Sequence, residues 1–565
     1  MVILGLCNIV GPKEVFSGFS GSAVMTILGI SIISAGLHQT GVATGLGRLM
    51  RRLGGQSDWR LILVVTLTSA TLSLFMNNIA AVGVLLPAVM SLSRHSQNSP
   101  SRLLMPLAFG TSLGGMATLL TTSNIIVSGT LRTAGFRGFG LLDFFPIGAP
   151  IVLLGALYLI TFGRRLLPGK QSVNKSEQRE PLQKELTQLY RLHENLLEVE
   201  VLPSCRLANQ SIAETGWGKN IGLSIIAVLH EQQTRLNPLP EYIIRPGDRL
   251  LVLGNAETDT LEGLRLRLIA ENSRQIPISD ETITLAELIV APHCSLIGDT
   301  LHNLHFREKF ELNVLAIWRE SRPIQKGIAE MPLRFGDALL VHGPASRIET
   351  FSQERNLILL EKDPDAVLKP SKRWLAIIIT LVTLTIAALG ILSTAEVVIA
   401  GAVLMLITRC IEINDAYQAI EWKAIFLIAG MWSLSIAISS TGLADQVIRS
   451  LSALLGAIPP LLVAGILTSL ACLFSQFMSG QVASLVLAPL AISAASYLGI
   501  HPYGLGMATA LGCSLTFPTP FGHPVNIMVM SPGGYTFKDY FRVGLPLTLL
   551  AFAAILFGLH LFWGL

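Results

Sequence analysis

Charged side chains are scarce in this sequence: Asp, Glu, Lys and Arg make up 14% of its 565 residues. Soluble proteins contain about 25% charged residues, and the hydrophobic share here is 51%. Most of the chain is therefore not an ordinary soluble protein. Its net charge is only +4, and this excess is too small and too scattered to indicate nucleic-acid binding.

Cysteine is also rare, and the motifs of common enzymes are missing. The six cysteines lie far apart and form no CxxC or Cys/His cluster, which argues against a disulfide framework and a zinc site. No GxxxxGK[ST] motif is present, so ATP-driven transport by this chain alone is not indicated. The GxSxG, HExxH and paired-carboxylate patterns are absent too. We therefore expect no enzymatic activity and no resident cofactor.

The few charges are unevenly distributed. Residues 1–165 and 371–565 together contain 18 of the 41 basic and 9 of the 37 acidic residues. The segment between them holds the remaining 41 − 18 = 23 basic and 37 − 9 = 28 acidic residues. We predict two membrane-embedded halves, 1–165 and 371–565, on either side of a soluble insert. The start of this insert, 166–195, is interpreted as a linker.

Long apolar runs occupy both halves. Six are long enough, or nearly so, to cross a bilayer, which takes about 20 helical residues. They lie near 23–38, 148–163, 373–393, 395–411, 422–439 and 543–563. Four further apolar stretches are interrupted by Gly, Pro, Ser or Asn, namely 60–93, 103–131, 459–497 and 502–531. Broken segments are tolerated at membrane depth only where they line a protein cavity.

An internal repeat relates the two halves. SLFMNNIAAVGVLLP at 73–87 resembles SQFMSGQVASLVLAP at 475–489, a displacement of 475 − 73 = 402. TSNIIV at 122–127 resembles PVNIMV at 524–529 with the same displacement. Over 73–127, 18 of 55 positions are identical without a gap. Each half is therefore predicted to contain one re-entrant hairpin and one broken crossing in the same order.

The predicted repeats must have opposite orientations, because each contains an odd number of full crossings. Inverted repeats with broken helices indicate a secondary transporter. With 166–370 placed in the cytoplasm, 15 Lys and Arg residues fall inside and 4 outside, in agreement with the positive-inside rule. The displacement places Met1 opposite Val403, inside a crossing. We therefore expect the first repeat to be truncated at its N-terminus by about 30–40 residues.

The soluble insert contains a repeat of its own. RPGDRLLVLG at 245–254 resembles RFGDALLVHG at 334–343, a displacement of 334 − 245 = 89. Short β-branched runs that end at a Gly-Asp turn are typical of strands. We predict two small α+β modules, at 196–270 and 284–361.

These residues resemble two known families. The two halves are similar to the divalent anion:sodium symporters, which include sodium/sulfate and sodium/dicarboxylate carriers, through FMNNIAAVGVLLP, FMSGQVASLVLAP and TPFGHPVNIMVMSPGG. The two modules resemble the C-terminal RCK (TrkA-C) modules of potassium-uptake regulators. The resemblance implies a polytopic α-helical membrane protein with two inverted repeats and re-entrant hairpins, a homodimer and an elevator-type motion. It also implies either a regulatory small ligand on the modules or a scaffold role for them.

The family's Ser-Asn-Thr signature at each hairpin tip is altered here. The tips read Asn77-Asn78-Ile79 and Ser479-Gly480-Gln481. The resemblance, applied position by position, implies sodium ligands at Ser73, Asn77, Asn78 and Leu120 in one site and at Ser475, Ser479, Gly480 and Gly522 in the other. It implies an anion site formed by Asn78, Ile79, Thr121, Thr122, Gly480, Gln481, His523 and Pro524.

The spacing of the serines allows two interpretations. Ser73 with Asn77, and Ser475 with Ser479, are i, i+4 pairs that would share one helix face. Alternatively, a serine hydroxyl in a membrane helix bonds to the carbonyl of the preceding turn and has no other role.

The expected function is Na⁺-coupled uptake of a small divalent anion by secondary active transport. Sulfate is the first choice, because a compact oxyanion needs fewer spread-out contacts than a dicarboxylate does. A di- or tricarboxylate symporter is the close alternative. From other classes, an RCK-regulated channel and a transporter-like nutrient sensor stay open, although a TVGYG-type potassium filter is absent.

Overall fold

The structure is a computed structural model of the 565-residue chain. The residues that it describes are 1–55, 57–96, 98–168, 190, 196–215, 223–231, 233–239, 241–254, 261, 263–269, 283–291, 294–319, 322–325, 327–354, 357–360, 370–443, 446, 449 and 459–565. The linker predicted at 166–195 lies almost entirely outside these residues.

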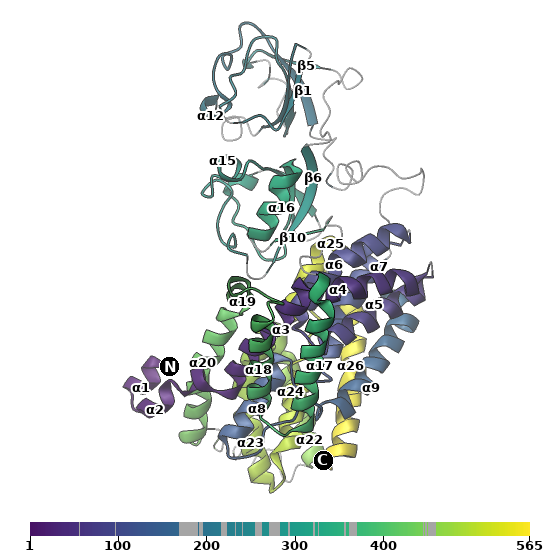
Figure 1. Ribbon diagram of the computed structural model, residues 1–565, viewed down its shortest axis with the longest axis vertical. Helices are drawn as coiled ribbons and strands as arrows, with labels where there is room; N and C mark the ends of the chain where they lie inside the picture. Colours follow the sequence, from purple (N-terminus) through teal and green to yellow (C-terminus); the bar gives the residue numbers. More distant parts are fainter. Residues whose placement is uncertain are drawn as a thin grey trace. The chain divides into compact units, whose positions relative to one another are not determined.

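The chain divides into two compact units (Figure 1). One combines residues 1–169 with 363–529 and 536–565, and the other combines 170–362 with 530–535. Helices form the first unit, and the strands belong to the second.

The helices before the insert begin and end close to the predicted breaks. They are α1 (Val2–Leu6), α2 (Pro12–Val15), η1 (Ser17–Ser20), α3 (Ser22–Gln39), α4 (Val42–Gly54), α5 (Asp58–Ser73), α6 (Asn78–His95), α7 (Pro100–Gly115), α8 (Thr122–Thr133), α9 (Phe145–Tyr158), the π-helical turn η2 (Leu159–Gly163) and α10 (Arg164–Leu166).

The helices after the insert show the same kind of interruption. They are η6 (Pro370–Lys372), α17 (Arg373–Leu389), α18 (Thr394–Ile407), α19 (Ile413–Ala419), α20 (Trp422–Ser440), α22 (Pro460–Phe477), α23 (Gly480–Leu498), α24 (Pro502–Gly512), η7 (Pro520–Gly522), α25 (Pro524–Gly533) and α26 (Phe537–Trp563). Local chemistry explains several ends. Gly390 ends α17 in the left-handed conformation (φ 66°), and Ser393 and Glu396 form a capping box at the start of α18.

Each of the four interrupted stretches is divided into two helices at its polar break. The pairs are α5 with α6, α7 with α8, α22 with α23, and α24 with α25. The starts of corresponding helices differ by 402 residues, as in 480 − 78 and 524 − 122. The packing recurs too: α5 packs against α7 and α22 against α24, while α6 packs against α7 and α23 against α24. The inverted orientation and the re-entrant geometry stay predictions.

Close backbone contacts explain two matched glycines of the repeat. A Cβ at Gly110 would lie 2.7 Å from the Thr66 carbonyl oxygen, and a Cβ at Gly512 would lie 2.8 Å from the Thr468 carbonyl oxygen. Thr66 and Thr468 are themselves 402 residues apart. Only glycine allows the helices to approach this closely at either place.

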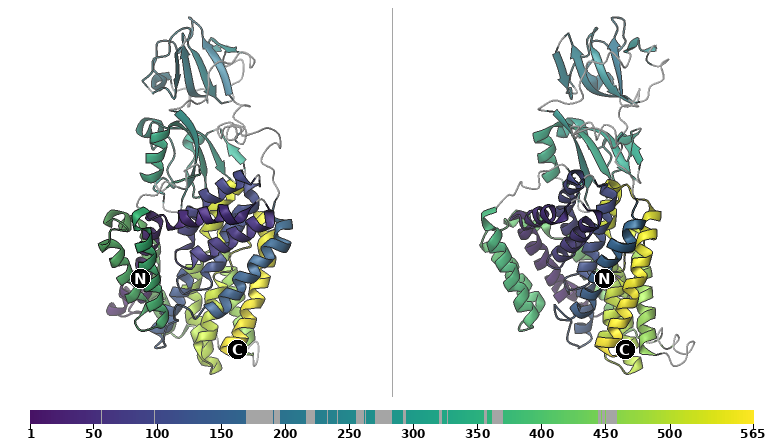
Figure 2. Two further views of the ribbon diagram at one scale, coloured as in Figure 1. Left: turned by 45° about the vertical axis from the view of Figure 1, so that its right-hand side comes forward. Right: turned by 90° about the vertical axis from the view of Figure 1, so that its right-hand side faces the viewer.

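Large apolar side chains cover much of the outside of the helical unit. Ile407 of α18 and Phe557 of α26 are 71% and 69% exposed. Among the described residues, five helices are long and apolar enough to cross a membrane, or six if the bent pair α19–α20 forms one span. The helices α9 and α26, one from each half of the chain, lie side by side in every view (Figures 1 and 2). These features fit a multi-pass membrane protein.

The insert forms two antiparallel five-stranded sheets. The first has the order β3-β2-β4-β1-β5, from β1 (Leu196–Val201), β2 (Ser224–His230), β3 (Gln233–Leu236), β4 (Arg249–Leu253) and β5 (Leu266–Ile269), with the short helix α12 (Ile212–Thr215). The second has the order β10-β6-β9-β7-β8, from β6 (Ile283–Val290), β7 (Asn313–Arg319), β8 (Arg322–Ile324), β9 (Ala338–Pro344) and β10 (Leu357–Leu359), with α15 (Phe306–Phe310), η5 (Ile328–Glu330) and α16 (Ala345–Glu354).

The two sheets have the same topology, as the 89-residue displacement predicts. β2 and β7 start 313 − 224 = 89 residues apart and carry a register shift at the same place. The strand that corresponds to each member of the first sheet occupies the same position in the second. An α+β insert is consistent with the prediction, whereas its likeness to RCK modules stays a prediction.

A buried aspartate closes the Gly-Asp turn in each module. The Oδ2 atoms of Asp248 and Asp337 accept from the backbone N–H of the residue three positions earlier, both at 2.8 Å. Beside Asp248 lies His230, with Nδ1 at 2.5 Å from Oδ1. Asp337 instead accepts two bonds from the Arg319 guanidinium, at 2.7 and 2.6 Å. The preceding glycines have φ of 88° and 86°, which explains the Gly-Asp sequence.

We expect Asp337→Ala to destabilise the second module by up to about 3–5 kcal/mol, because it leaves the Arg319 charge, only 13% exposed, without its carboxylate partner. Amide hydrogen exchange in the purified full-length protein would show faster exchange in β7 and β9. Asp337→Asn, which keeps the shape and part of the bonding, should cost less. Unchanged protection in the alanine variant would contradict this role.

Candidate functional site

The first predicted tip lies between the end of α5 and the start of α6. Ser73 is the last residue of α5, and Asn78 is the first residue of α6. The Ser73 hydroxyl donates to Asn78 Oδ1 at 2.5 Å, and both side chains are buried. Asn77, in the break itself, accepts from the Ile79 backbone N–H at 3.0 Å. Ser73 therefore contributes to the tip and does not bond the preceding turn.

The predicted pairing of Ser73 with Asn77 on one helix face is wrong. The helix α5 ends at Ser73, so Asn77 lies in the irregular break and its amide turns away toward Glu421. The second pair fails for the same reason, since α22 ends at Phe477 and Ser479 is the N-cap residue of α23. Polar residues at the tips stop the helices before an i, i+4 contact can form.

The break between α7 and α8 lies against the first tip. The Thr121 hydroxyl donates to the carbonyl of Gly115, the last residue of α7. A Cβ at Gly115 would lie 2.8 Å from Thr121 Oγ1 and 3.0 Å from Asn78 Oδ1. The structure thus brings together Asn78 and Thr121, which were predicted to share the site. Leu120 is buried in the same break, and Thr122 begins α8.

The second tip makes contact with the first half of the chain. A Cβ at Gly480 would lie 2.6 Å from the Cys513 carbonyl oxygen and 3.1 Å from Ser123 Oγ, in the first turn of α8. Gly480 therefore allows α23 to begin directly against α8. Ser475 is buried, and its hydroxyl donates to the Cys472 carbonyl at 2.8 Å. This bond agrees with the alternative interpretation, in which the serine bonds only to the preceding turn. Ser479 is exposed.

Gln476 forms hydrogen bonds to the break between α24 and α25, and the sequence analysis did not identify this residue. Its amide donates to the Leu515 carbonyl at 2.9 Å, and its oxygen accepts from the Thr519 hydroxyl at 3.0 Å. A Cβ at Gly522 would lie 3.0 Å from the same Gln476 oxygen. The repeat offered no signal for this residue, because the matching position of the first half is Leu74.

Two matched asparagines brace the breaks before α8 and α25. The Asn124 amide donates to the Thr118 carbonyl at 2.7 Å, and the Asn526 amide donates to the Thr516 carbonyl at 2.8 Å. Both side chains are fully buried, and neither Oδ1 atom has a hydrogen-bond partner among the residues that the structure describes. A buried amide oxygen without a partner needs an explanation, and a bound cation is one, because carboxamide oxygens are good ligands for hard cations.

The remaining predicted anion ligands occupy the starts of helices. Gln481 lies in the first turn of α23, where its carbonyl accepts from the Ser484 hydroxyl at 2.8 Å. His523 precedes α25, and its Nδ1 accepts from the Val525 backbone N–H at 3.3 Å. Pro524 is the first residue of α25. Ile79 is partly buried in the first turn of α6.

A carboxylate beside the first tip was also missed. The Asn77 amide donates to Oε1 of Glu421, which directly precedes α20. The two residues are 344 positions apart, and the repeat places Phe19 opposite Glu421. Only the tertiary structure reveals this contact. A negative charge next to a predicted sodium ligand would favour a cation there.

On the expectation of sodium coupling from the sequence, Glu421→Gln should raise the sodium concentration that half-saturates uptake by about 10- to 100-fold, the usual effect of losing a group that orients a metal ligand. Uptake measured against sodium concentration in proteoliposomes checks this. Glu412→Gln, which removes an exposed carboxylate at the start of α19, is the matched control. Equal shifts in both variants would contradict a local role for Glu421.

Comparison with known proteins decides the family. The CitMHS family, described as Citrate transporter, matches residues 1–510. The chain belongs to the citrate transporter family. It is 30% identical to the Uncharacterized transporter sll0640 of Synechocystis, over 97% of this chain and 90% of the relative. It is 29% identical to the Uncharacterized transporter YfbS of Escherichia coli, over 98% and 93%.

A relative with a named substrate is more distant. The Probable sodium/sulfate cotransporter 3 of Chlamydomonas reinhardtii is 21% identical, over 95% of this chain and 82% of the relative. The likeness to the divalent anion:sodium symporters is therefore confirmed, and so is the prediction that this citrate transporter family member is a transporter and not an enzyme.

Proposed function

We propose that this member of the citrate transporter family couples the inward movement of Na⁺ to the uptake of a small divalent anion, with sulfate as the first choice. The observation that carries the proposal is the convergence of helix N-termini. Asn78, Thr122 and Gly480 begin α6, α8 and α23. The contacts at Gly115 and Gly480 place the starts of α6 and α23 against the start of α8.

Converging N-termini favour an anion. Each helix carries about +0.5 charge at its N-terminus and offers N–H groups that have no partner in the helix. No Lys or Arg occurs among the predicted ligands, so helix dipoles, amides and sodium would balance the charge of the anion. Broken helices that meet near the midplane in inverted repeats are the usual design of such carriers.

Sodium would bind at the oxygen atoms of the same breaks. Ser73 and Asn78 supply side-chain oxygens at the first tip. The Oδ1 atoms of Asn124 and Asn526, one in each half, have no partner within the described part of the chain, which supports one sodium site per repeat. A cation bound beside the anion lowers the cost of bringing the anion into the protein. This coupling, an elevator-type motion between inverted repeats, a homodimer and a cytoplasmic insert complete the proposal.

A di- or tricarboxylate is the second candidate for the substrate. The family description as Citrate transporter favours it. The altered tips favour sulfate, because both threonines of the Ser-Asn-Thr signature are missing here.

The deciding experiment measures uptake by the purified full-length protein in proteoliposomes. Labelled sulfate, succinate and citrate are each offered with an inward gradient of Na⁺ or of K⁺. We expect saturable sulfate uptake with Na⁺ only. Uptake of succinate or citrate without sulfate would establish the carboxylate alternative. Ohmic conductance would indicate a channel, and binding without flux would indicate a sensor.

A further inference from the structure

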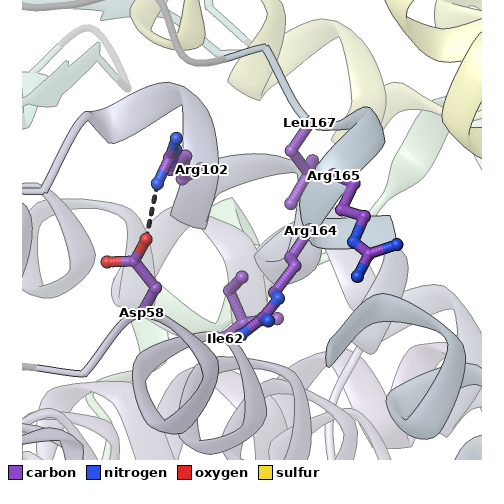
Figure 3. Close-up of a pocket in the computed structure, with 6 residues that line it drawn as sticks. All are labelled: Asp58, Ile62, Arg102, Arg164, Arg165 and Leu167. Carbon is purple, nitrogen blue, oxygen red and sulfur yellow. Dashed lines mark hydrogen bonds and ion pairs between the residues drawn. The ribbon is translucent and has the colours of Figure 1, made fainter. Parts of the chain in front are cut away.

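A pocket rich in arginine lies away from the tips, where α5, α7 and α10 meet (Figure 3). Its volume is about 440 Å³. Its lining consists of Asp58, Ile62, Arg102, Arg164, Arg165 and Leu167. Three guanidinium groups against one carboxylate give the lining a charge of 3 − 1 = +2.

The charges in this pocket are only partly paired. Arg102 contacts the Asp58 carboxylate at 2.5 Å, and each side chain is 39% exposed. Arg164 and Arg165 form no ion pair or hydrogen bond from their side chains to any described residue. Guanidinium groups bind phosphate oxygens through paired N–H donors. The guanidinium groups of Arg164 and Arg165, which have no described partner, are therefore available to an anionic group.

The pocket lies at the end of a candidate membrane span. The span runs over Phe145–Leu166, so Arg164 and Arg165 occupy its last turn. Just before them, Leu157 and Phe162 are 54% and 69% exposed, as expected for side chains that face acyl chains. The π-helical turn Leu159–Gly163, which contains Phe162, directly precedes the two arginines. Arginines at the end of a span lie at the depth of lipid headgroups.

We propose that this pocket binds the phosphate group of an anionic phospholipid. Arg164 and Arg165 donate hydrogen bonds to the oxygens of the lipid's negatively charged phosphate group. Arg102 exchanges its bond to Asp58 for a bond to the same phosphate. A free phosphate ion offers the same oxygens, but only a lipid also places acyl chains against the apolar surface of α9. Basic pockets between transmembrane helices are suited to anionic headgroups.

The test is lipid binding by the full-length protein, measured by native mass spectrometry. Phosphatidylglycerol, phosphatidylcholine and inorganic phosphate are titrated separately. We expect phosphatidylglycerol to bind at least about 10-fold more tightly than phosphatidylcholine, because only the former has a net negative charge. The double variant Arg164→Gln/Arg165→Gln should lose this preference. Asp58→Asn should strengthen it, because Arg102 is then released for the phosphate.

A matched control removes two other arginines of the same half. Arg52→Gln/Arg60→Gln has the same change in charge, both side chains are exposed, and neither lines the pocket. It should keep the preference for phosphatidylglycerol. An equal loss in both double variants would overturn the proposal in favour of nonspecific charge attraction. Binding of inorganic phosphate without any preference for the anionic lipid would overturn the lipid as the source of the phosphate.

Discussion

Asn78→Ala is expected to abolish Na⁺-dependent anion uptake at ordinary sodium concentrations, because the apparent sodium affinity should fall by about 100-fold or more. Losing a group that merely orients a metal ligand already lowers metal affinity by about 10- to 100-fold. The substitution removes the oxygen that accepts from Ser73 at 2.5 Å and that lies next to Gly115 and Thr121. Initial uptake rates in proteoliposomes, measured over a range of sodium concentrations, give the result.

The control for this prediction must separate loss of function from loss of fold. Asn303→Ala changes the same residue type at an exposed position in the second module, and it should transport normally. Both proteins should elute as the same species in size-exclusion chromatography and should melt at similar temperatures. Normal uptake by a well-folded Asn78→Ala protein would refute the assignment of the first tip.

Gly480→Ala should reduce uptake at least about 10-fold without unfolding the helical unit. The added Cβ would lie 2.6 Å from the Cys513 carbonyl oxygen and 3.1 Å from Ser123 Oγ. Because the Cys513 carbonyl at the end of α24 cannot move aside easily, the start of α23 must shift and cannot keep its position against Ser123 of α8. The helix N-termini that face the proposed anion would then separate. A sulfate titration of the uptake rate should show a raised KM.

Gly430→Ala is the matched control for the second tip. Gly430 lies inside α20, and apart from its own stretch of helix no heavy atom of the described residues comes within 4 Å of an added Cβ there. Alanine is the better helix former by about 1 kcal/mol, so this variant should be at least as stable as the parent protein and equally active. If Gly480→Ala transports as well as Gly430→Ala, close contact between α23 and α8 is not needed for function.

Much of the architecture could be predicted because it depends on local properties of the chain. The apolar run near 23–38 forms α3, and the interrupted stretch 60–93 divides into α5 and α6 as its Asn-Asn pair suggests. The 89-residue repeat predicted two equal modules, and the sheets have the same strand order. Hydropathy, helix breakers and repeated motifs carry this information within short windows.

The partners of individual polar groups could not be predicted in the same way. Ser73 and Ser475 are matched by the repeat, yet one bonds Asn78 and the other bonds the Cys472 carbonyl. The i, i+4 argument assumed continuous helices through the tips, whereas both helices stop there. A repeat predicts which elements correspond, but side-chain contacts depend on neighbours that differ between the two halves.

The amino-acid sequence alone determined that most of this chain is apolar helix, where those helices are interrupted, and that a paired α+β insert separates two related halves. The tertiary structure decided which distant residues meet: Glu421 with Asn77, Ser123 with Gly480, and the arginines of α7 and α10. The physical reason is the separation along the sequence over which each effect acts. Hydropathy and helix breaking act within a few residues. These residues lie tens to hundreds of positions apart in the sequence, and only the packing of helices brings them together.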